Sequence, residues 1–79
     1  MTLEARIYKR DRHWVFHIED WDEDLDAPVN EKWTESIEWT VEQLEDSPLA
    51  QRMSYDMWYF KWRLDAERFK TFWALKWLS

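Results

Sequence analysis

Glycine and cysteine are both absent from the 79-residue chain, and proline occurs only twice. Without glycine the chain has no glycine-rich loop of the kind that cradles phosphate groups in nucleotide-binding proteins. Any turn that needs a left-handed backbone must therefore use Asp, Asn or a similar residue. Without cysteine there is no disulfide framework, thiol nucleophile or thiolate zinc site, and we expect a reducing, cytoplasmic setting.

Long apolar runs are also missing, because no segment approaches the ~18 apolar residues of a membrane helix. Aromatic residues, in contrast, are abundant: the chain has eight Trp, four Phe and three Tyr. Each aromatic side chain can bury about 150–250 Å², which helps a short chain to form a core. We therefore expect one folded domain over residues 1–79, with no membrane segment.

The net charge of −6 is unevenly distributed. Residues 19–46 carry twelve acidic side chains and a single basic one, Lys32. The segments before and after this block carry more basic than acidic residues. A block of one charge sign is typical of an interaction surface or of a solvated face.

The first part of the chain predicts a β-hairpin. Residues 3–8 and 14–19 alternate between two kinds of side chain, with many β-branched and aromatic residues. Such period-two alternation is typical of strands. Arg10-Asp11-Arg12 separates the two runs and predicts a tight turn, with Asp11 in the left-handed position that glycine usually takes.

The rest of the chain predicts helix, strand and helix. Residues 31–46 show one apolar stripe at helical spacing, formed by Trp33, Ile37, Val41 and Leu44. Residues 49–55 are interpreted as a linker, and residues 57–64 as a third strand with Trp58, Phe60, Trp62 and Leu64 on one face. Residues 66–78 predict a second helix, capped by Asp65, whose buried face holds Ala66, Phe69, Phe72, Trp73 and Trp77.

The predicted fold class is α+β, with the element order β-β-α-β-α. A three-stranded antiparallel or mixed sheet with both helices on one face is the simplest way to bury the apolar sides of all five elements. A helical interpretation of residues 50–64 stays open as the alternative.

A short resemblance concerns the C-terminal quarter of the chain. It rests on an aromatic strand followed by the pattern D-A-x-x-F-K-x-x-W, matched here by Trp58, Tyr59, Phe60, Asp65, Ala66, Phe69, Lys70 and Trp73. In these features the segment resembles short, uncharacterised bacteriophage-encoded proteins. The usual Leu after the Lys is replaced by Thr71. The resemblance implies a phage or prophage origin and no particular activity.

The leading candidate site is an acidic row on the helix predicted over residues 31–46. Its members recur at spacings of 4, 3, 4 and 3, which places them on one side of the helix, opposite the apolar stripe. The acidic row consists of Glu31, Glu35, Glu38, Glu42 and Glu45. Such a row can bind a basic protein surface, or it can simply keep a tryptophan-rich protein soluble.

The acidic loop before that helix adds further candidates: Asp20, Asp22, Asp24 and Asp26. Together with Glu31 these residues match positions 1, 3, 5, 7 and 12 of a calcium-binding loop. Leu25 stands where that loop needs glycine, so we predict no dedicated metal site. Trp21 and Trp39 lie beside the carboxylates, where they would anchor an arginine-rich partner.

No feature of an enzyme stands out. The chain has no glycine-framed nucleophile, and no pair among its many carboxylates is distinguished as an acid and a base. We therefore expect no catalytic residue and no cofactor.

We predict a non-enzymatic, acidic protein-binding domain, specifically a phage-encoded inhibitor or adaptor in the host cytoplasm. Its nucleic-acid-mimicking face would bind a basic surface on a host nucleic-acid-handling protein, without binding nucleic acid directly. Two alternatives stay open. One is a homo-oligomeric accessory protein, such as a homodimer, that uses surplus aromatic residues as its interface. The other is a weak divalent-metal-binding module.

Overall fold

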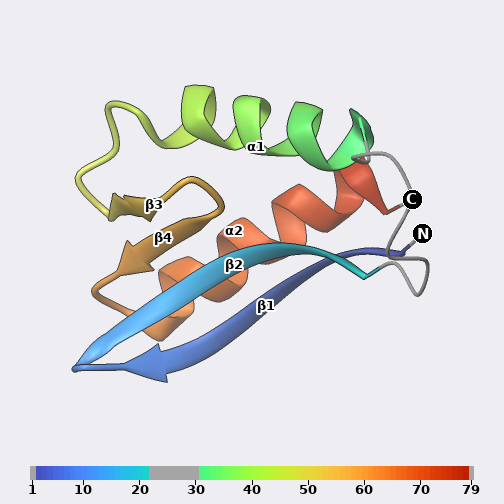
Figure 1. The fold of residues 1–79 in the computed structure, drawn as a ribbon. Helices are drawn as coiled ribbons and strands as arrows, with labels where there is room; N and C mark the ends of the chain where they lie inside the picture. The colour runs from blue at the N-terminus through green and yellow to red at the C-terminus, as the bar shows by residue number, and fades with distance from the viewer. Residues whose placement is uncertain (1, 22–30, 79) are drawn as a thin grey trace.

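A computed structural model of the chain describes residues 2–21 and 31–78. The described part contains four strands and two helices in the order β-β-α-β-β-α. Their bounds are Thr2–Arg10 (β1), His13–Trp21 (β2), Glu31–Leu44 (α1), Ala50–Ser54 (β3), Met57–Phe60 (β4) and Arg63–Trp77 (α2). Figure 1 shows the two helices and the strands in this arrangement. The predicted α+β class is confirmed.

The sheet has four antiparallel strands in the order β1-β2-β4-β3, where three were predicted. It is built from two hairpins that join through β2 and β4, and each hairpin is followed by a helix. The segment predicted as a linker contains the extra strand, β3. Its pairing with β4 is irregular between Arg52 and Ser54. A short edge strand with a bulge need not show period-two alternation, which explains why the sequence pattern missed it.

The turn of the first hairpin follows the prediction for Asp11 and adds a second residue. Asp11 has a φ of 48° and Arg12 a φ of 70°. Arg10 pairs with His13, so these two residues form the whole connection. A two-residue turn with positive φ at both positions matches the right-handed twist of the flanking strands. Arg12 adopts this conformation without the steric freedom of glycine.

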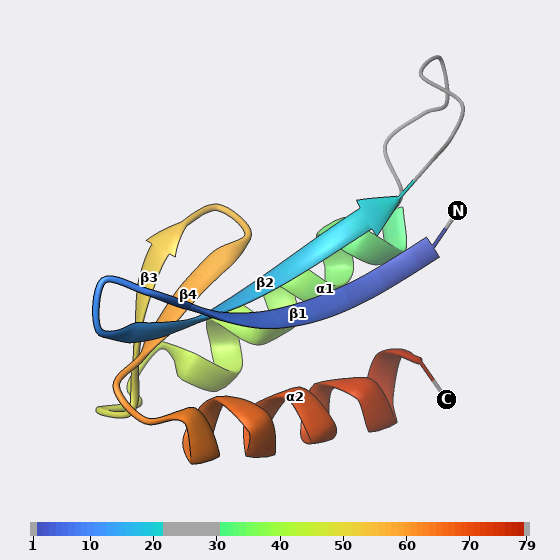
Figure 2. The ribbon, with the colours of Figure 1, turned by 90° about the horizontal axis from the view of Figure 1, so that it is seen from below.

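The hydrophobic core lies on one face of the sheet. Both helices pack there, with α1 contacting β2 and β3 and α2 contacting β1, β2 and β4. Figure 2 shows β1 and β2 crossing in front of α1, with α2 running alongside β1. The buried cluster consists of Ala5, Phe16, Ile18, Ile37, Leu44, Trp58, Phe60, Ala66 and Trp73. Phe16 is at its centre, because its ring lies 5.2–6.5 Å from those of Trp58, Phe60, Phe69 and Trp73.

The prediction for residues 57–64 is correct only for its first half. Trp58 and Phe60 are buried as expected, but β4 ends at Phe60, and Trp62 and Leu64 are 61% and 56% exposed. The pairing explains why. Trp14 pairs with Phe60, and β2 reaches its own turn only two residues before Trp14. No backbone is left to pair with Trp62, so the chain turns away and α2 begins at Arg63.

The start of α2 also differs from the prediction. Trp62 is the N-cap residue and makes no side-chain capping hydrogen bond, and Asp65 lies within the first turn of the helix. Ala66 and Trp73 are fully buried, while Phe72, predicted in the same buried face, is 51% exposed.

In the part of the chain that the structure describes, neither helix combines the length and hydropathy that crossing a bilayer requires.

Candidate functional site

Helix α1 is fixed to the rest of the protein by its buried side. Ile37 and Thr40 are completely buried, and the Thr40 hydroxyl donates a hydrogen bond of 2.7 Å to the backbone oxygen of Ser36. At the first turn, the indole Nε1 of Trp33 donates a 3.0 Å hydrogen bond to the backbone oxygen of Ile18 in β2. This bond connects α1 to β2 at Ile18, just after the last residue of β2 that pairs with β4.

The acidic row occupies the opposite side of α1. All five glutamates are exposed; four lie within the helix and Glu45 follows its last residue. At ~1.5 Å per residue the row extends for about 20 Å. None of the ion pairs among the described residues involves a member of the row. The helix therefore presents a row of charge of one sign on a firmly packed support.

Trp39, predicted as an anchor beside the row, is half-buried and packs against the core. Its ring packs against Phe69, Phe72 and Trp77 of α2, at centroid distances of 6.1, 5.2 and 6.2 Å. The ammonium of Lys76 lies 6.0 Å from the same ring. Trp39 thus packs between the two helices. Sequence analysis missed this contact, because the position of α2 beside α1 follows from tertiary packing.

The acidic loop is described only at its start. Asp20, predicted in the connector, belongs to β2 and is half-buried, and Trp21 is the last residue of that strand. The strand thus continues one residue beyond the point where the calcium-loop pattern begins. Asp22, Asp24 and Asp26 lie outside the described residues. Within those residues no group of three potential metal ligands converges.

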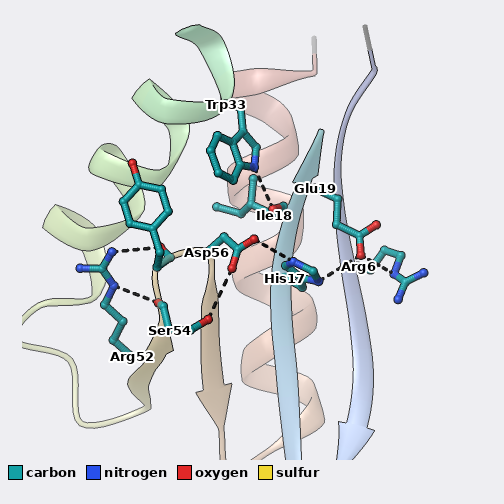
Figure 3. A network of polar contacts seen from close by, with 9 residues as sticks. Arg6, His17, Ile18, Glu19, Trp33, Arg52, Ser54 and Asp56 are labelled. Atoms are coloured by element: carbon teal, nitrogen blue, oxygen red, sulfur yellow. Dashed lines mark hydrogen bonds and ion pairs between the residues drawn. The ribbon is translucent and has the colours of Figure 1, made fainter. Parts of the chain in front are cut away.

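A polar network on the face of the sheet opposite the helices was not predicted (Figure 3). His17 lies at its centre, with Nδ1 3.0 Å from Glu19 Oε1 and Nε2 3.0 Å from Asp56 Oδ2. Asp56 also accepts a hydrogen bond from Ser54, and Arg6 lies 3.3 Å from Glu19. The network joins β1, β2 and the turn between β3 and β4. Its carboxylates are held by Arg6, by the imidazole of His17 and by a hydroxyl, so its clearest role is to hold the two hairpins together.

A cluster of basic residues, the basic pole, lies where the tip of the first hairpin meets the corner between β4 and α2. Arg63 and Lys9 flank Trp14, at 5.2 and 6.0 Å from its ring centroid, and His13 contacts Tyr59. The pole consists of Lys9, Arg10, Arg12, Lys61 and Arg63, all exposed. Basic charge at both ends of the chain was visible in the sequence, but its meeting at one place depends on the pairing of β2 with β4.

The outer face of α2 is the second surface that sequence analysis missed. Its apolar residues are Leu64, Phe72 and Leu75, continued by the C-cap residue Leu78, and each is more than half exposed. They follow a helical spacing on the side away from buried Ala66 and Trp73. With apolar residues on both sides, α2 lacks the one-sided pattern by which an exposed face is normally recognised.

The comparisons with known proteins do not assign the chain to a family. No family model matches it, and searches of curated proteins and of solved structures return no match. Any functional assignment therefore depends on the geometry of the site itself.

Proposed function

We propose that the protein is a non-enzymatic binding domain that presents the acidic row of α1 to a basic surface on another protein. The observation that carries the proposal is the set of five exposed glutamates on one side of a helix, with no ion pair to them among the described residues. Like charges at i, i+4 repel each other by about 0.2–0.5 kcal/mol per pair. The row therefore costs the free protein stability, and a basic partner would relieve this repulsion.

The support of the row favours this function over a purely solubilising role. Buried Ser36, Ile37, Thr40 and Leu44, with the Trp33 bond to β2, hold α1 in one orientation. A preorganised charged surface loses little conformational entropy when it binds. Charge complementarity also raises the rate of association with an oppositely charged partner.

The partner that fits best is a protein that handles nucleic acid. Glutamates along the row have Cβ separations of about 5–6 Å, while phosphates of one DNA strand are separated by ~3.4 Å of axial rise and by somewhat more along the curved backbone. A basic groove that binds phosphates would therefore also accept the row. An inhibitor or adaptor of phage origin, acting in the host cytoplasm, fits this function and the C-terminal resemblance.

The anchoring role predicted for Trp39 stays in the proposal, beside the packing of its ring on Phe69, Phe72 and Trp77 of α2. Asp20, Asp22, Asp24, Asp26 and Trp21 stay in the proposal as a flanking part of the acidic surface. Their contribution is best tested separately from that of the row, because the loop precedes α1 in the chain.

The experiment compares two doubly reversed variants with the same net charge. Glu38→Lys/Glu42→Lys changes the row, and Asp46→Lys/Glu67→Lys changes two exposed acids outside it. The immobilised variants are incubated with lysate from a bacterial host, and bound proteins are eluted with double-stranded DNA. We expect the control variant to retain DNA-elutable basic proteins and the row variant to lose them, with unchanged circular dichroism. Equal capture by the two variants would refute the proposal.

A further inference from the structure

Strand β1 is nine residues long and stands at one end of the sheet. It pairs with β2 along one edge only. The outer edge of a terminal strand carries backbone donors and acceptors that have no partner within the sheet, and it is a template for another strand. Leu3 and Ile7 lie on the helix-covered face of β1 and are only half-buried, although they pack against the core.

The opposite face of β1 carries an unfavourable charge arrangement. Glu4 stands directly across from Glu19 of β2, and like charges at directly opposed positions destabilise a sheet. Arg6 is the neighbouring cation on that face, and it pairs with Glu19 at 3.3 Å. In addition, Glu19 Oε2 is buried and has no hydrogen-bond partner among the described residues. A further cation beside Glu4 would relieve this excess of negative charge.

We propose that two copies of the protein associate through β1, in an antiparallel pair centred on Ala5. This register places Glu4 opposite Arg6 of the partner subunit, and by symmetry it forms that ion pair twice. It also places Leu3 opposite Ile7 of the partner subunit twice, on the face that the helices cover. The two four-stranded sheets become one continuous sheet of eight strands.

Other registers lack this double match. A pair centred on Glu4 or on Arg6 would set two like charges directly against each other across the axis. A pair centred on Ile7 would place Leu3 opposite Asp11, which lies in the turn and not in the strand. Only the register centred on Ala5 combines opposite charges on one face with apolar contacts on the other.

The position of α2 fits the same arrangement. The helix contacts both β1 and β2, and its side toward α1 is the one that packs on Trp39. Because α2 contacts β1, β2 and β4, two copies related by an axis beside β1 would be separated by about two to three strand spacings, ~10–14 Å, and would lie next to each other on the same face of the continuous sheet. A shallow groove on α2, lined by Glu67, Lys70, Thr71, Ala74, Leu75 and Leu78, would then face its counterpart.

The test uses two charge reversals at β1 and measures mass by size-exclusion chromatography with light scattering. We expect the native protein to have twice the chain mass of 10.0 kDa and to dissociate on dilution. In the proposed register, Glu4→Arg places two arginines opposite each other at both 4–6 pairs. Arg6→Glu places two glutamates opposite each other at the same pairs. Each variant alone should therefore be monomeric. An equimolar mixture restores two opposite-charge pairs and should form a heterodimer.

The design separates loss of association from loss of folding. Within one chain Glu4→Arg replaces a like-charge pair with Glu19 by an opposite-charge pair, so this variant should fold at least as well as the native protein. Asp46→Arg, at an exposed acid after α1, makes the same change in net charge away from β1 and should stay dimeric. A native protein that is monomeric at all concentrations, or a Glu4→Arg variant that stays dimeric, would overturn the proposal.

Discussion

Helices α1 and α2 cover the same face of the sheet and present opposite chemistry to the outside. Each inserts fully buried residues into the shared core, Ile37 from α1 and both Ala66 and Trp73 from α2. On the outside, α1 carries the acidic row, whereas α2 and its C-cap residue carry four apolar side chains that are more than half exposed. Helices with the same structural task therefore differ in the surface that each offers to a partner.

This difference separates two kinds of association. A charged face is well solvated in the free protein, and it is suited to a partner that binds and leaves. An exposed apolar face gains free energy when a partner buries it, so it is suited to a lasting contact. We therefore connect α1 with a basic partner protein, and α2 together with β1 with a second copy of this chain.

The largest expected effect tests whether both helices depend on one core. Trp73 is fully buried, and Trp73→Ala should reduce the free energy of unfolding by about 3–5 kcal/mol. Trp39 is half-buried between the helices, so Trp39→Ala should cost about 1–3 kcal/mol. Urea denaturation followed by circular dichroism gives both values. If Trp39→Ala had no effect on stability, its assignment as an interhelical contact would be wrong.

The next effect concerns the anchoring of α1. Trp33→Phe keeps an aromatic ring but removes the donor that bonds to the Ile18 oxygen. Because that oxygen would lose a partner, we expect a loss of about 1–2 kcal/mol. Trp62→Phe is the matched control, since Trp62 is 61% exposed and should tolerate the change. Equal loss in both variants would show that the indole bond does not anchor α1.

The smallest expected change in stability has opposite signs in the two helices. Glu38→Gln removes repulsion from Glu35 and Glu42, so it should stabilise the protein by about 0.2–0.5 kcal/mol per neighbouring pair. Glu67→Gln in α2 removes an exposed pair with Arg63, at 2.9 Å, and should destabilise by a similar amount. Thermal unfolding at low ionic strength measures both. Added salt should reduce both changes in stability. Changes of the same sign in the two variants would contradict the difference between α1 and α2.

The sequence predicted those features that depend on one element and its own period. The stripe and the acidic row of α1 follow directly from helical spacing, and the first hairpin follows from alternation and from Asp11 at its turn. The structure places these features as expected. The buried residues of α2 were only partly predicted, because its outer face is apolar as well.

Features that depend on contacts between elements were not predictable in this way. The end of β4 is set by the turn of its neighbour β2, and the position of Trp39 is set by α2. The short strand β3 has no period of its own, and its pairing with β4 defines it. The candidate site shows the same division, since the row was visible along the chain while the basic pole and the edge of β1 needed the sheet.

The most direct test of the central claim is a binding titration with a DNA-elutable protein captured by the native chain. The dissociation constant for that protein is measured at several salt concentrations for three forms of the chain. They are the native chain, the row variant Glu38→Lys/Glu42→Lys and the control Asp46→Lys/Glu67→Lys. We predict that the dissociation constant increases by a factor at least ten times larger for the row variant than for the control. The remaining binding of the row variant should also depend less on salt. Equal affinities for the row variant and the control would contradict the assignment of α1 as the binding surface.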